Sequence, residues 1–525
     1  MTRVARVVAV LGAAAILAAP AVPLPVTSDG TAAVSSPDGR RPVVVIGRDG
    51  VASAAAAVQA AGGTVRSRLP IVDGVAADVP AAAVPGLRES PAVRSVSADA
   101  AVALASSSFG GASTASTATT YPRSTGAAQA WAGGSTGTGV RVAVLDTGIA
   151  PVADLAGRVV AGPDLSGEGN SLIDSYGHGT VMAGIIAGNG VTSRLDGTGA
   201  TVGMAPSAGL VSVKLAGRSG ATDVSTVLAG MQWVGSFHDK YGIRVVNLSW
   251  GTRSQQSATV DPLDFAVERL WREGLVVVAA AGNTGPEPGT ITKPGDDPVV
   301  LTAGAYNEHE NTLPDDDSVP AWSAQGPTVD GVSKPDVVAP GRLVVSTVAR
   351  GSRIALSNPQ AMQGADYIRG SGTSQATAVV SGAAALLLSA RPGLTPDQLK
   401  QALRSTATRL PQRGAPQGRG RISVPGALAA DVSGSRPQPL PATGLGSLEA
   451  SRGGYHVVTI CPGSATPQVI EGEQDARCRP WDPSTWSGES WSGESWSSQG
   501  FQSAFWGQRP AWDRRLPGEM SAPRP

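Results

Sequence analysis

The sequence predicts an α/β fold in which a parallel sheet carries helices on both faces. Apolar runs of strand length alternate with helix-length segments between residues 126 and 430, and polar motifs directly follow several of these runs. Strands of parallel sheets are buried on both faces and are therefore almost continuously apolar. We predict strands at 142–146, 211–215, 245–249, 275–280 and 299–305, and helices at 224–237, 263–273 and 376–390.

A smaller α+β unit is predicted at residues 42–104, ahead of this region. Its apolar and alternating segments indicate strands at 43–47, 64–69, 74–79 and 92–96 and helices at 53–61 and 81–88. The order β-α-β-β-α-β is the split βαβ arrangement. Residues 105–125, largely Ser, Thr, Ala and Gly, are predicted to form an accessible linker that a protease would cut easily.

Residues 1–21 have the pattern of a secretory signal peptide. Arg3 and Arg6 precede an apolar stretch at 7–19, and Ala19-Pro20-Ala21 supplies small residues at a cleavage site. The alternative is an N-terminal membrane anchor, but this stretch is shorter than a bilayer requires. We therefore expect a secreted, extracellular protein without a transmembrane anchor, and no later segment is predicted to span a membrane.

The composition argues against two classes of partner. The chain has 41 basic and 41 acidic residues among 525, so nothing in its charge indicates nucleic acid or an anionic membrane as a partner. In an oxidising compartment the two cysteines, Cys461 and Cys478, are expected to form a disulfide. His238, His309 and His456 have no second ligand at metal-like spacing and are interpreted as ordinary surface or loop residues.

Four polar residues of the main region are predicted to form a nucleophilic site. Ser374 lies between a glycine-rich turn and an apolar helix, whose N-terminus would stabilise a nearby oxyanion. His178 opens a short helix over 181–187, and Asp146 ends an apolar strand. A serine hydroxyl needs a general base, imidazole has a suitable pKa, and a carboxylate fixes its tautomer. Asn283 follows another strand and is the candidate donor to the oxyanion.

The motifs around these residues resemble those of the subtilisin-like (subtilase) serine peptidase family. They are Asp-Thr-Gly at 146–148, Gly-His-Gly-Thr at 177–180, Ala-Ala-Gly-Asn at 280–283 and Gly-Thr-Ser-x-Ala at 372–376, in that family's order. Each motif alone is more often an ordinary turn or a packed residue, but four in order are not expected by chance. The resemblance covers roughly residues 126–410. Gln375 and Ala378 stand where the family usually has Met and Pro.

This resemblance implies a subtilisin-like fold and a role for each residue. Asp146, His178 and Ser374 would be the catalytic triad, and the Asn283 side chain and the Ser374 backbone N–H would form the oxyanion hole. Two segments would line the primary specificity pocket, the first with Ser249, Trp250 and Gly251, the second with Ala280 and Gly282. An extended substrate would add to an exposed edge as a strand. Trp250 either shapes the pocket or points into the core.

No cofactor and no metal ion are expected for catalysis. Asp154-Leu155 resembles a calcium-site segment of some members of the family, so a structural calcium ion is kept as an alternative. The acidic group at 315–317 is interpreted as a solvated loop.

The resemblance also implies that residues 42–104 are an inhibitory propeptide, which the enzyme itself removes by cleavage between about 103 and 125. The alternative is a stable accessory domain. We expect a secreted, monomeric serine endopeptidase that cleaves proteins or peptides through an acyl-enzyme. A competing hypothesis is a surface-binding protein whose peptidase domain serves only self-processing. An esterase is disfavoured because α/β-hydrolases have the order Ser, acid, His.

Residues 431–525 are predicted to be a Pro-, Trp- and Ser-rich tail. Leu440 to Gly444 match a sorting motif for cell-wall attachment, but no apolar span with a basic end follows, so we interpret the match as accidental. Trp486, Trp491 and Trp496 repeat with a period of five, which fits neither a helix nor a simple strand. They belong either to a loosely packed tail or to an aromatic ladder that binds a glycan or another surface.

Overall fold

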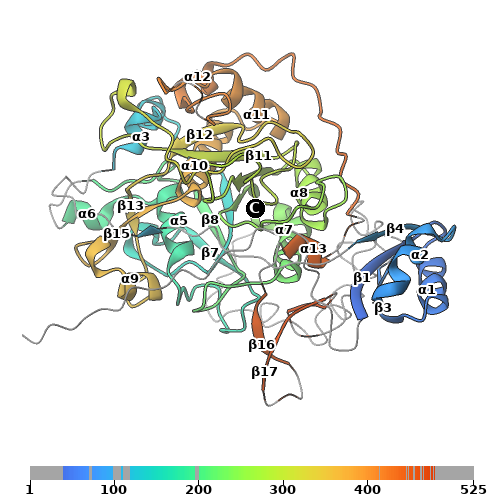
Figure 1. Ribbon diagram of the computed structural model, residues 1–525. Helices are drawn as coiled ribbons and strands as arrows, with labels where there is room; N and C mark the ends of the chain where they lie inside the picture. The colour runs from blue at the N-terminus through green and yellow to red at the C-terminus, as the bar shows by residue number, and fades with distance from the viewer. Residues whose placement is uncertain are drawn as a thin grey trace, which may run out of the picture.

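The computed structural model describes residues 40–69, 74–97, 108–109, 119–195 and 200–412, and most of 414–478 (Figure 1). The predicted signal peptide at 1–21 and the Trp repeats at 486–496 lie outside the described residues. Of the predicted linker at 105–125, the structure describes residues 108–109 and 119–125.

Residues 40–97 form a four-stranded antiparallel sheet in the order β2-β3-β1-β4. The two helices pack on it, and Val45, Val58 and Val75 belong to a core of its own, separate from the main core. The predicted order of elements is confirmed. The elements are β1 (Arg40–Gly47), α1 (Val51–Ala60), β2 (Thr64–Leu69), β3 (Gly74–Pro80), the 3-10 turn η2 (Ala81–Ala83), α2 (Val84–Glu89) and β4 (Val93–Ser97).

The main body is built on a seven-stranded sheet in the order β12-β11-β10-β9-β6-β8-β7. All neighbouring strands in it run parallel, which confirms the predicted α/β class. Each predicted strand is present within about two residues, while β7 and β12 were not predicted. The strands are β6 (Arg141–Asp146), β7 (Val159–Asp164), β8 (Gly209–Lys214), β9 (Ile243–Leu248), β10 (Val276–Ala280), β11 (Leu301–Tyr306) and β12 (Val337–Pro340).

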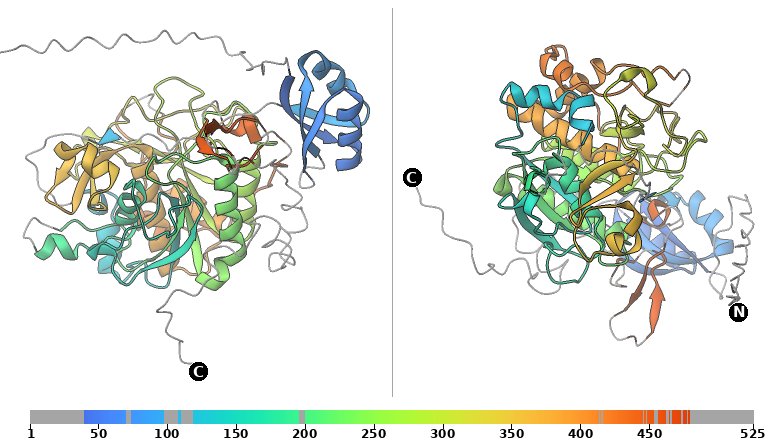
Figure 2. Two further views of the ribbon diagram at one scale, coloured as in Figure 1. Left: turned by 90° about the horizontal axis from the view of Figure 1, so that it is seen from below. Right: turned by 90° about the vertical axis from the view of Figure 1, so that its left-hand side faces the viewer.

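Helices cover both faces of this sheet (Figures 1 and 2). On one face α5 (His178–Ala187) packs against α10 (Thr373–Ala390), and on the other α7 (Val224–Tyr241) packs against α8 (Pro262–Arg272). Among the described residues, α10 alone is long and apolar enough to cross a membrane, but 89% of it is buried as a core helix. The shorter helices are α3 (Tyr121–Ser124), α4 (Ala127–Ala132), α6 (Val191–Leu195), α9 (Arg353–Ser357), α11 (Pro396–Ser405) and α12 (Val424–Ala429), with 3-10 turns η3 (Ala153–Leu155), η4 (Pro314–Asp316) and η5 (Pro359–Ala361).

Side chains set the starts of several helices. Asp223 caps α7 and Asp261 caps α8, each accepting from a backbone N–H two residues on. Thr395 and Gln398 form a capping box at the start of α11. Ala378 stands within α10, which is a continuous helix from Thr373 to Ala390.

A second, smaller sheet leads into α10. It contains β13 (Val344–Thr347), β14 (Met362–Gln363) and β15 (Tyr367–Ser371) in the order β13-β15-β14. The two-residue strand β5 (Ser108–Phe109) also pairs antiparallel with β15, Phe109 opposite Gly370 and Ser108 opposite Ser371. The strand β5, which follows the small N-terminal unit in the chain, is therefore paired with residues that come three and four positions before Ser374.

Part of the predicted tail is packed against the main body. Residues 446–478, the C-terminal extension from here on, contain α13 (Leu448–Arg452) and a hairpin of β16 (Val458–Ile460) and β17 (Pro467–Val469). The helix α13 contacts α7 and α8. The predicted Cys461–Cys478 disulfide is present and closes the hairpin segment.

Candidate active site

Asp146 and His178 meet at the carboxyl edge of the main sheet. Asp146 is the last residue of β6 and His178 is the first residue of α5. The His178 Nδ1 lies 2.8 Å from both Asp146 carboxylate oxygens, and both side chains are buried. This contact assigns the Nδ1 proton to the carboxylate side, so that Nε2 is the nitrogen that can accept a proton.

Asp174 fixes the turn that carries His178. Its carboxylate accepts hydrogen bonds from the Gly177 and Thr180 backbone N–H groups and from the Thr147 and Thr180 hydroxyls, at 2.6–2.8 Å. Thr147 Oγ1 in turn accepts from the backbone N–H of Gly179. Sequence reasoning did not identify Asp174, because its partner Thr147, 27 residues earlier, becomes a neighbour only through the fold.

Lys214 was also not identified from the sequence. It ends β8 and pairs in register with Asp146 on β6. Its buried ammonium donates to the carbonyl oxygens of Thr147 (2.5 Å) and Ile173 (2.8 Å) and lies 3.2 Å from the Glu168 carboxylate. A buried ammonium needs such partners, and here they join the loops on either side of the Asp146–His178 pair.

Ser374 is the second residue of α10, at the same edge of the sheet. Its Oγ donates to the Ser249 carbonyl oxygen at 2.9 Å, and the Ser249 hydroxyl donates back to the Ser374 carbonyl oxygen at 3.1 Å. Because Ser249 directly follows β9, these bonds hold the start of α10 at the carboxyl ends of the strands.

The packing of α5 against α10 brings His178 and Ser374 to the same end of the helix pair. Both helices begin at this edge of the sheet and therefore run in the same direction. A Cβ atom added to Gly382 of α10 would lie 3.2 Å from the Ile186 carbonyl oxygen of α5. His178 and Ser374 each lie eight residues before this contact.

Asn283 lies beside the start of α10. Its Oδ1 accepts hydrogen bonds from the Thr373 backbone N–H (2.8 Å) and the Thr373 hydroxyl (2.9 Å). The same hydroxyl accepts from the backbone N–H of Gly282 at 3.1 Å. Thr373, which sequence reasoning did not single out, thereby fixes the orientation of the carboxamide, whose Nδ2 is its donor.

The two predicted pocket segments lie against Thr292. A Cβ atom on Gly251 would lie 2.3 Å from Thr292 Oγ1, and one on Gly282 would lie 2.8 Å from Thr292 Cγ2, so both positions require glycine. Gly282 also has a φ of +109°, which other residues rarely adopt.

The side chains of two other predicted pocket residues are buried in the fold. Trp250 belongs to the main core and is fully buried, which resolves the alternative left open by the sequence: it points into the core. Ala280 is the buried end of β10. Ser249 is present at the site, but its hydroxyl binds the backbone of Ser374.

The acidic residues that the sequence singles out have protein partners. Asp154 Oδ2 accepts from the Tyr367 hydroxyl (2.6 Å) and Oδ1 from the Thr192 backbone N–H (2.8 Å). In the 315–317 group, Asp316 accepts from Asn311 and Asp317 pairs with Arg421 at 2.9 Å. Within the described ranges, no three His, Cys, Asp or Glu side chains cluster as metal ligands.

One of the remaining histidines has a structural role. His238 bonds the Gly235 carbonyl oxygen, and His309 lies near Asn307 and Ser318 in a loop. His456 is a loop residue, as interpreted from the sequence, but it is partly buried and lies 2.8 Å from the Glu449 carboxylate.

The electrostatics of the site favour a protonated His178. Burial alone would lower the pKa of His178, but the charge of Asp146 and its hydrogen bond outweigh burial and raise this pKa above its usual value. Burial raises the pKa of the Asp174 carboxyl despite four hydrogen bonds to it. The arrangement thus stabilises an imidazolium, the species formed when a hydroxyl gives its proton to His178.

Comparison with known proteins points to one family. A sequence profile described as "Subtilase family" matches residues 137–421. Serine protease AprX of Bacillus subtilis (strain 168) is 38% identical over 275 residues, which are 51% of this chain and 61% of that protein. Subtilisin Savinase of Lederbergia lenta is 36% identical over 277 residues, 53% of this chain and 86% of that protein. The match therefore spans less than two thirds of AprX but most of Savinase.

A solved structure shares the fold. Fervidolysin from Fervidobacterium pennivorans, described as a keratinolytic enzyme related to subtilisin, superposes with a TM-score of 0.55. It is 24% identical, and the superposition covers 75% of this chain and 61% of that chain. At this identity the likeness supports the fold alone.

Proposed function

The chain belongs to the subtilase family of serine proteases, and on this premise we propose that it is an endopeptidase that hydrolyses peptide bonds of proteins or peptides through an acyl-enzyme on Ser374. The observation that carries the proposal is the contact of His178 Nδ1 with both Asp146 oxygens, 2.8 Å each, next to the start of α10. This is the arrangement that a serine nucleophile requires.

In the proposed mechanism His178 Nε2 takes the Ser374 proton as Oγ attacks the peptide carbonyl. Asp146 stabilises the imidazolium, and the Asn283 carboxamide with the Ser374 backbone N–H binds the oxyanion. His178 then gives the proton to the leaving amine, and water releases the acyl group. Every step uses groups of this chain together with water, and no cofactor.

We further propose that residues 42–104 are a propeptide and that the enzyme cleaves itself behind them. The pairing of β5 with β15 supports this, because it lays Ser108 opposite Ser371 in an antiparallel register. Extended backbone that kept this antiparallel register before Ser108 would approach Ser374. With roughly 3.3 Å per extended residue, the scissile bond is expected about one to three residues before Ser108.

Export is proposed from the pattern at residues 1–21, and a monomer is the expected state. The competing hypothesis, a surface-binding protein with a self-processing domain, is not favoured by any feature of the described residues.

The test compares intact mass and N-terminal sequence of the secreted protein with those of a Ser374→Ala variant. We expect the parent protein to begin about one to three residues before Ser108, and the variant to keep residues 42–104. A Ser389→Ala variant, in the same helix but away from the site, should mature normally. Identical mature ends in parent and Ser374→Ala would assign the cleavage to another protease, and retention of residues 42–104 in both would refute the propeptide.

A further inference from the structure

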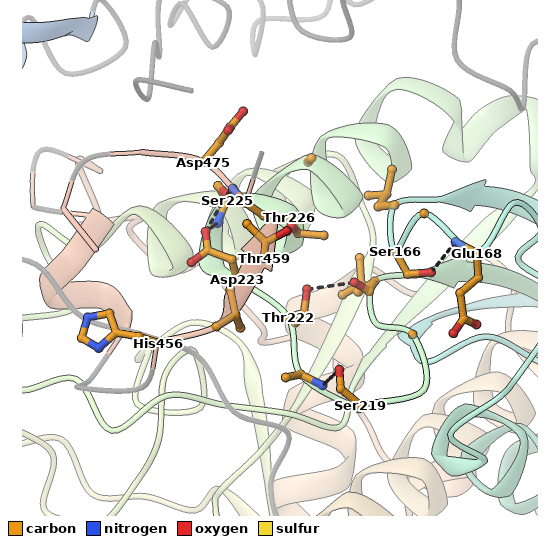
Figure 3. A pocket seen from close by; sticks show the side chains of 18 residues that line it. Ser166, Glu168, Ser219, Thr222, Asp223, Ser225, Thr226, His456, Thr459 and Asp475 are labelled. Carbon is orange, nitrogen blue, oxygen red and sulfur yellow. Dashed lines mark hydrogen bonds between the residues drawn. The ribbon is translucent and has the colours of Figure 1, made fainter. Parts of the chain in front are cut away.

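A cavity of about 620 Å³ lies between the main body and the C-terminal extension (Figure 3). Its inner wall is the loop that follows β8, with Gly217, Ser219 and Thr222, and the start of α7. Its outer wall is the extension, with His456, Thr459 and Asp475. This volume lies within the range of ligand-binding clefts and is large enough for more than one side chain.

The inner wall of the cavity adjoins the catalytic edge. A Cβ atom on Gly220 would lie 2.5 Å from the ring of Tyr176, which precedes His178 by two residues. The Arg353 guanidinium donates to the Ser219 carbonyl oxygen at 3.3 Å and so ties the loop to α9. The loop therefore lies directly beside the turn that carries the proposed base.

The outer wall is held in place by a buried guanidinium. Arg452 is fully buried and binds both Asp223 oxygens, through Nε at 2.5 Å and Nη2 at 3.2 Å. It also donates to Glu449 (3.0 Å) and to the Gly472 and Gln474 carbonyl oxygens (2.6 and 2.5 Å). Because Asp223 also caps α7, Arg452 joins α13, the segment at 472–474 and the start of α7 at one point.

Further bonds fix the same orientation of the extension. The Ala476 backbone N–H donates to the Ser225 hydroxyl at 3.0 Å, and the Ser451 hydroxyl donates to Asp261, the cap of α8, at 3.0 Å. The Cys461–Cys478 disulfide closes the hairpin that carries Thr459. The outer wall is thus a fixed part of the fold.

The line of an extended substrate through the site follows from β5. Since β5 runs antiparallel to β15, an extended substrate that follows the direction of β5 would approach Ser374 with the residues on its N-terminal side. Ser249 binds Ser374, and the loop after β8 contacts Tyr176, two residues before His178, through Gly220. We therefore expect the residues on the acyl side of the scissile bond to pass the His178 turn and to arrive at the inner wall of the cavity.

We propose that the C-terminal extension is the outer wall of the cleft that receives the acyl-side residues of an extended polypeptide substrate. The inference rests on the proposed endopeptidase function. The cleft is lined by hydroxyl groups of Thr222, Thr226 and Thr459, by aliphatic groups such as Leu215 and by the carboxylates of Glu168, Asp223 and Asp475, a mixture suited to a peptide backbone. Arg452 is a positioning residue, because it acts through the extension and not on the substrate.

The experiment measures kcat/KM of the mature full chain on two quenched peptides with the same scissile bond. One extends about two residues and the other about six residues, or about 20 Å, on the acyl side. We expect the longer peptide to be cleaved about tenfold more efficiently by the parent enzyme, because it gains binding in the cleft. Arg452→Met should lose most of this gain, chiefly through a higher KM for the long peptide. Arg350→Met, which breaks the exposed ion pair with Asp366, should retain it.

A second pair of variants keeps the test decisive if Arg452→Met does not fold. Thr459→Trp fills the cleft from the outer wall and should lose the gain, whereas Ile460→Trp, whose parent side chain is 63% exposed on the next residue, should keep it. An unchanged gain in Thr459→Trp or in folded Arg452→Met would overturn the proposal. Failure of the endopeptidase function itself looks different: the parent would cleave neither peptide, or Ser374→Ala would cleave both equally well.

Discussion

At the scale of single residues, the site is made by groups whose neighbours decide their chemistry. Two opposing effects of the surroundings act on the pKa of His178. Burial lowers this pKa and Asp146 raises it, and the effect of Asp146 prevails. Asp174 shows a different division of labour, since its hydrogen bonds go to the turn and not to the imidazole. It positions His178 and its charge adds to the rise in the pKa of His178, but Asp146 contributes most to that rise.

A pH profile tests the balance at His178. The base must be neutral to accept the Ser374 proton, so kcat/KM should rise with pH, and the midpoint of the rise should lie above the value of about 6.5 for free imidazole. Asp146→Asn should lower this midpoint and reduce kcat by up to about 10⁴-fold, as such changes do in other triads. A parent midpoint below that of free imidazole, or the same midpoint in both proteins, would contradict the assignment.

At the scale of elements, Lys293 ties the segments after β9 and β10 to α8. Its backbone exchanges two hydrogen bonds with Thr252, at 2.9 and 3.0 Å. Its ammonium is buried between the carboxylates of Asp264 on α8 (2.7 Å) and Asp296 (2.6 Å). Thr292, the residue before Lys293, contacts both predicted pocket segments. The two ion pairs of Lys293 therefore help to hold these segments in place.

Replacing this lysine should destabilise the protein. Lys293→Met keeps the aliphatic volume but leaves two buried carboxylates without their cation, and we expect a loss of about 3–5 kcal/mol in the free energy of unfolding. Urea denaturation in a Ser374→Ala background, which removes self-digestion, measures it. The exposed Lys240→Met on α7 is the control and should change stability by less than about 0.5 kcal/mol. An equally small loss for Lys293→Met would show that the ion pair contributes little.

At the scale of the whole molecule, a buried carboxyl links the start of the peptidase region to the sheet. Glu308, shortly after β11, is buried and accepts hydrogen bonds from the hydroxyls of Thr120 and Ser124, on either side of the start of α3. Burial raises the pKa of Glu308 to about 7. The unfolded chain therefore releases this proton at lower pH than the folded protein does, and stability should fall as pH rises from about 4.5 to 7.

Glu308→Gln tests this linkage. An amide does not ionise, so between about pH 5 and 8 the variant should lose less stability than the parent, by up to about 3 kcal/mol. Thermal unfolding across this range, again with Ser374→Ala, is the measurement, and the exposed Glu287→Gln is the control. Glu268 and Asp317, with pKa values of about 8 and about 6, titrate in the same range. The decisive quantity is therefore the difference in stability between variant and parent at each pH. If stability changes with pH in the same way in both proteins, the role of Glu308 is contradicted.

From the sequence we could predict the α/β class and the split βαβ unit, both present in the structure, and single out Asp146, His178, Asn283 and Ser374 as the candidate site. These follow from local patterns, because a buried strand is apolar along its length and a residue at a strand end or helix start carries its own short motif. The tertiary structure alone decided the rest. Asp174, Lys214 and Thr373 each bind a partner distant in sequence, Trp250 lies in the core, and α13 of the C-terminal extension packs against α7 and α8. Their contacts depend on which segments pack together, and no local periodicity records that.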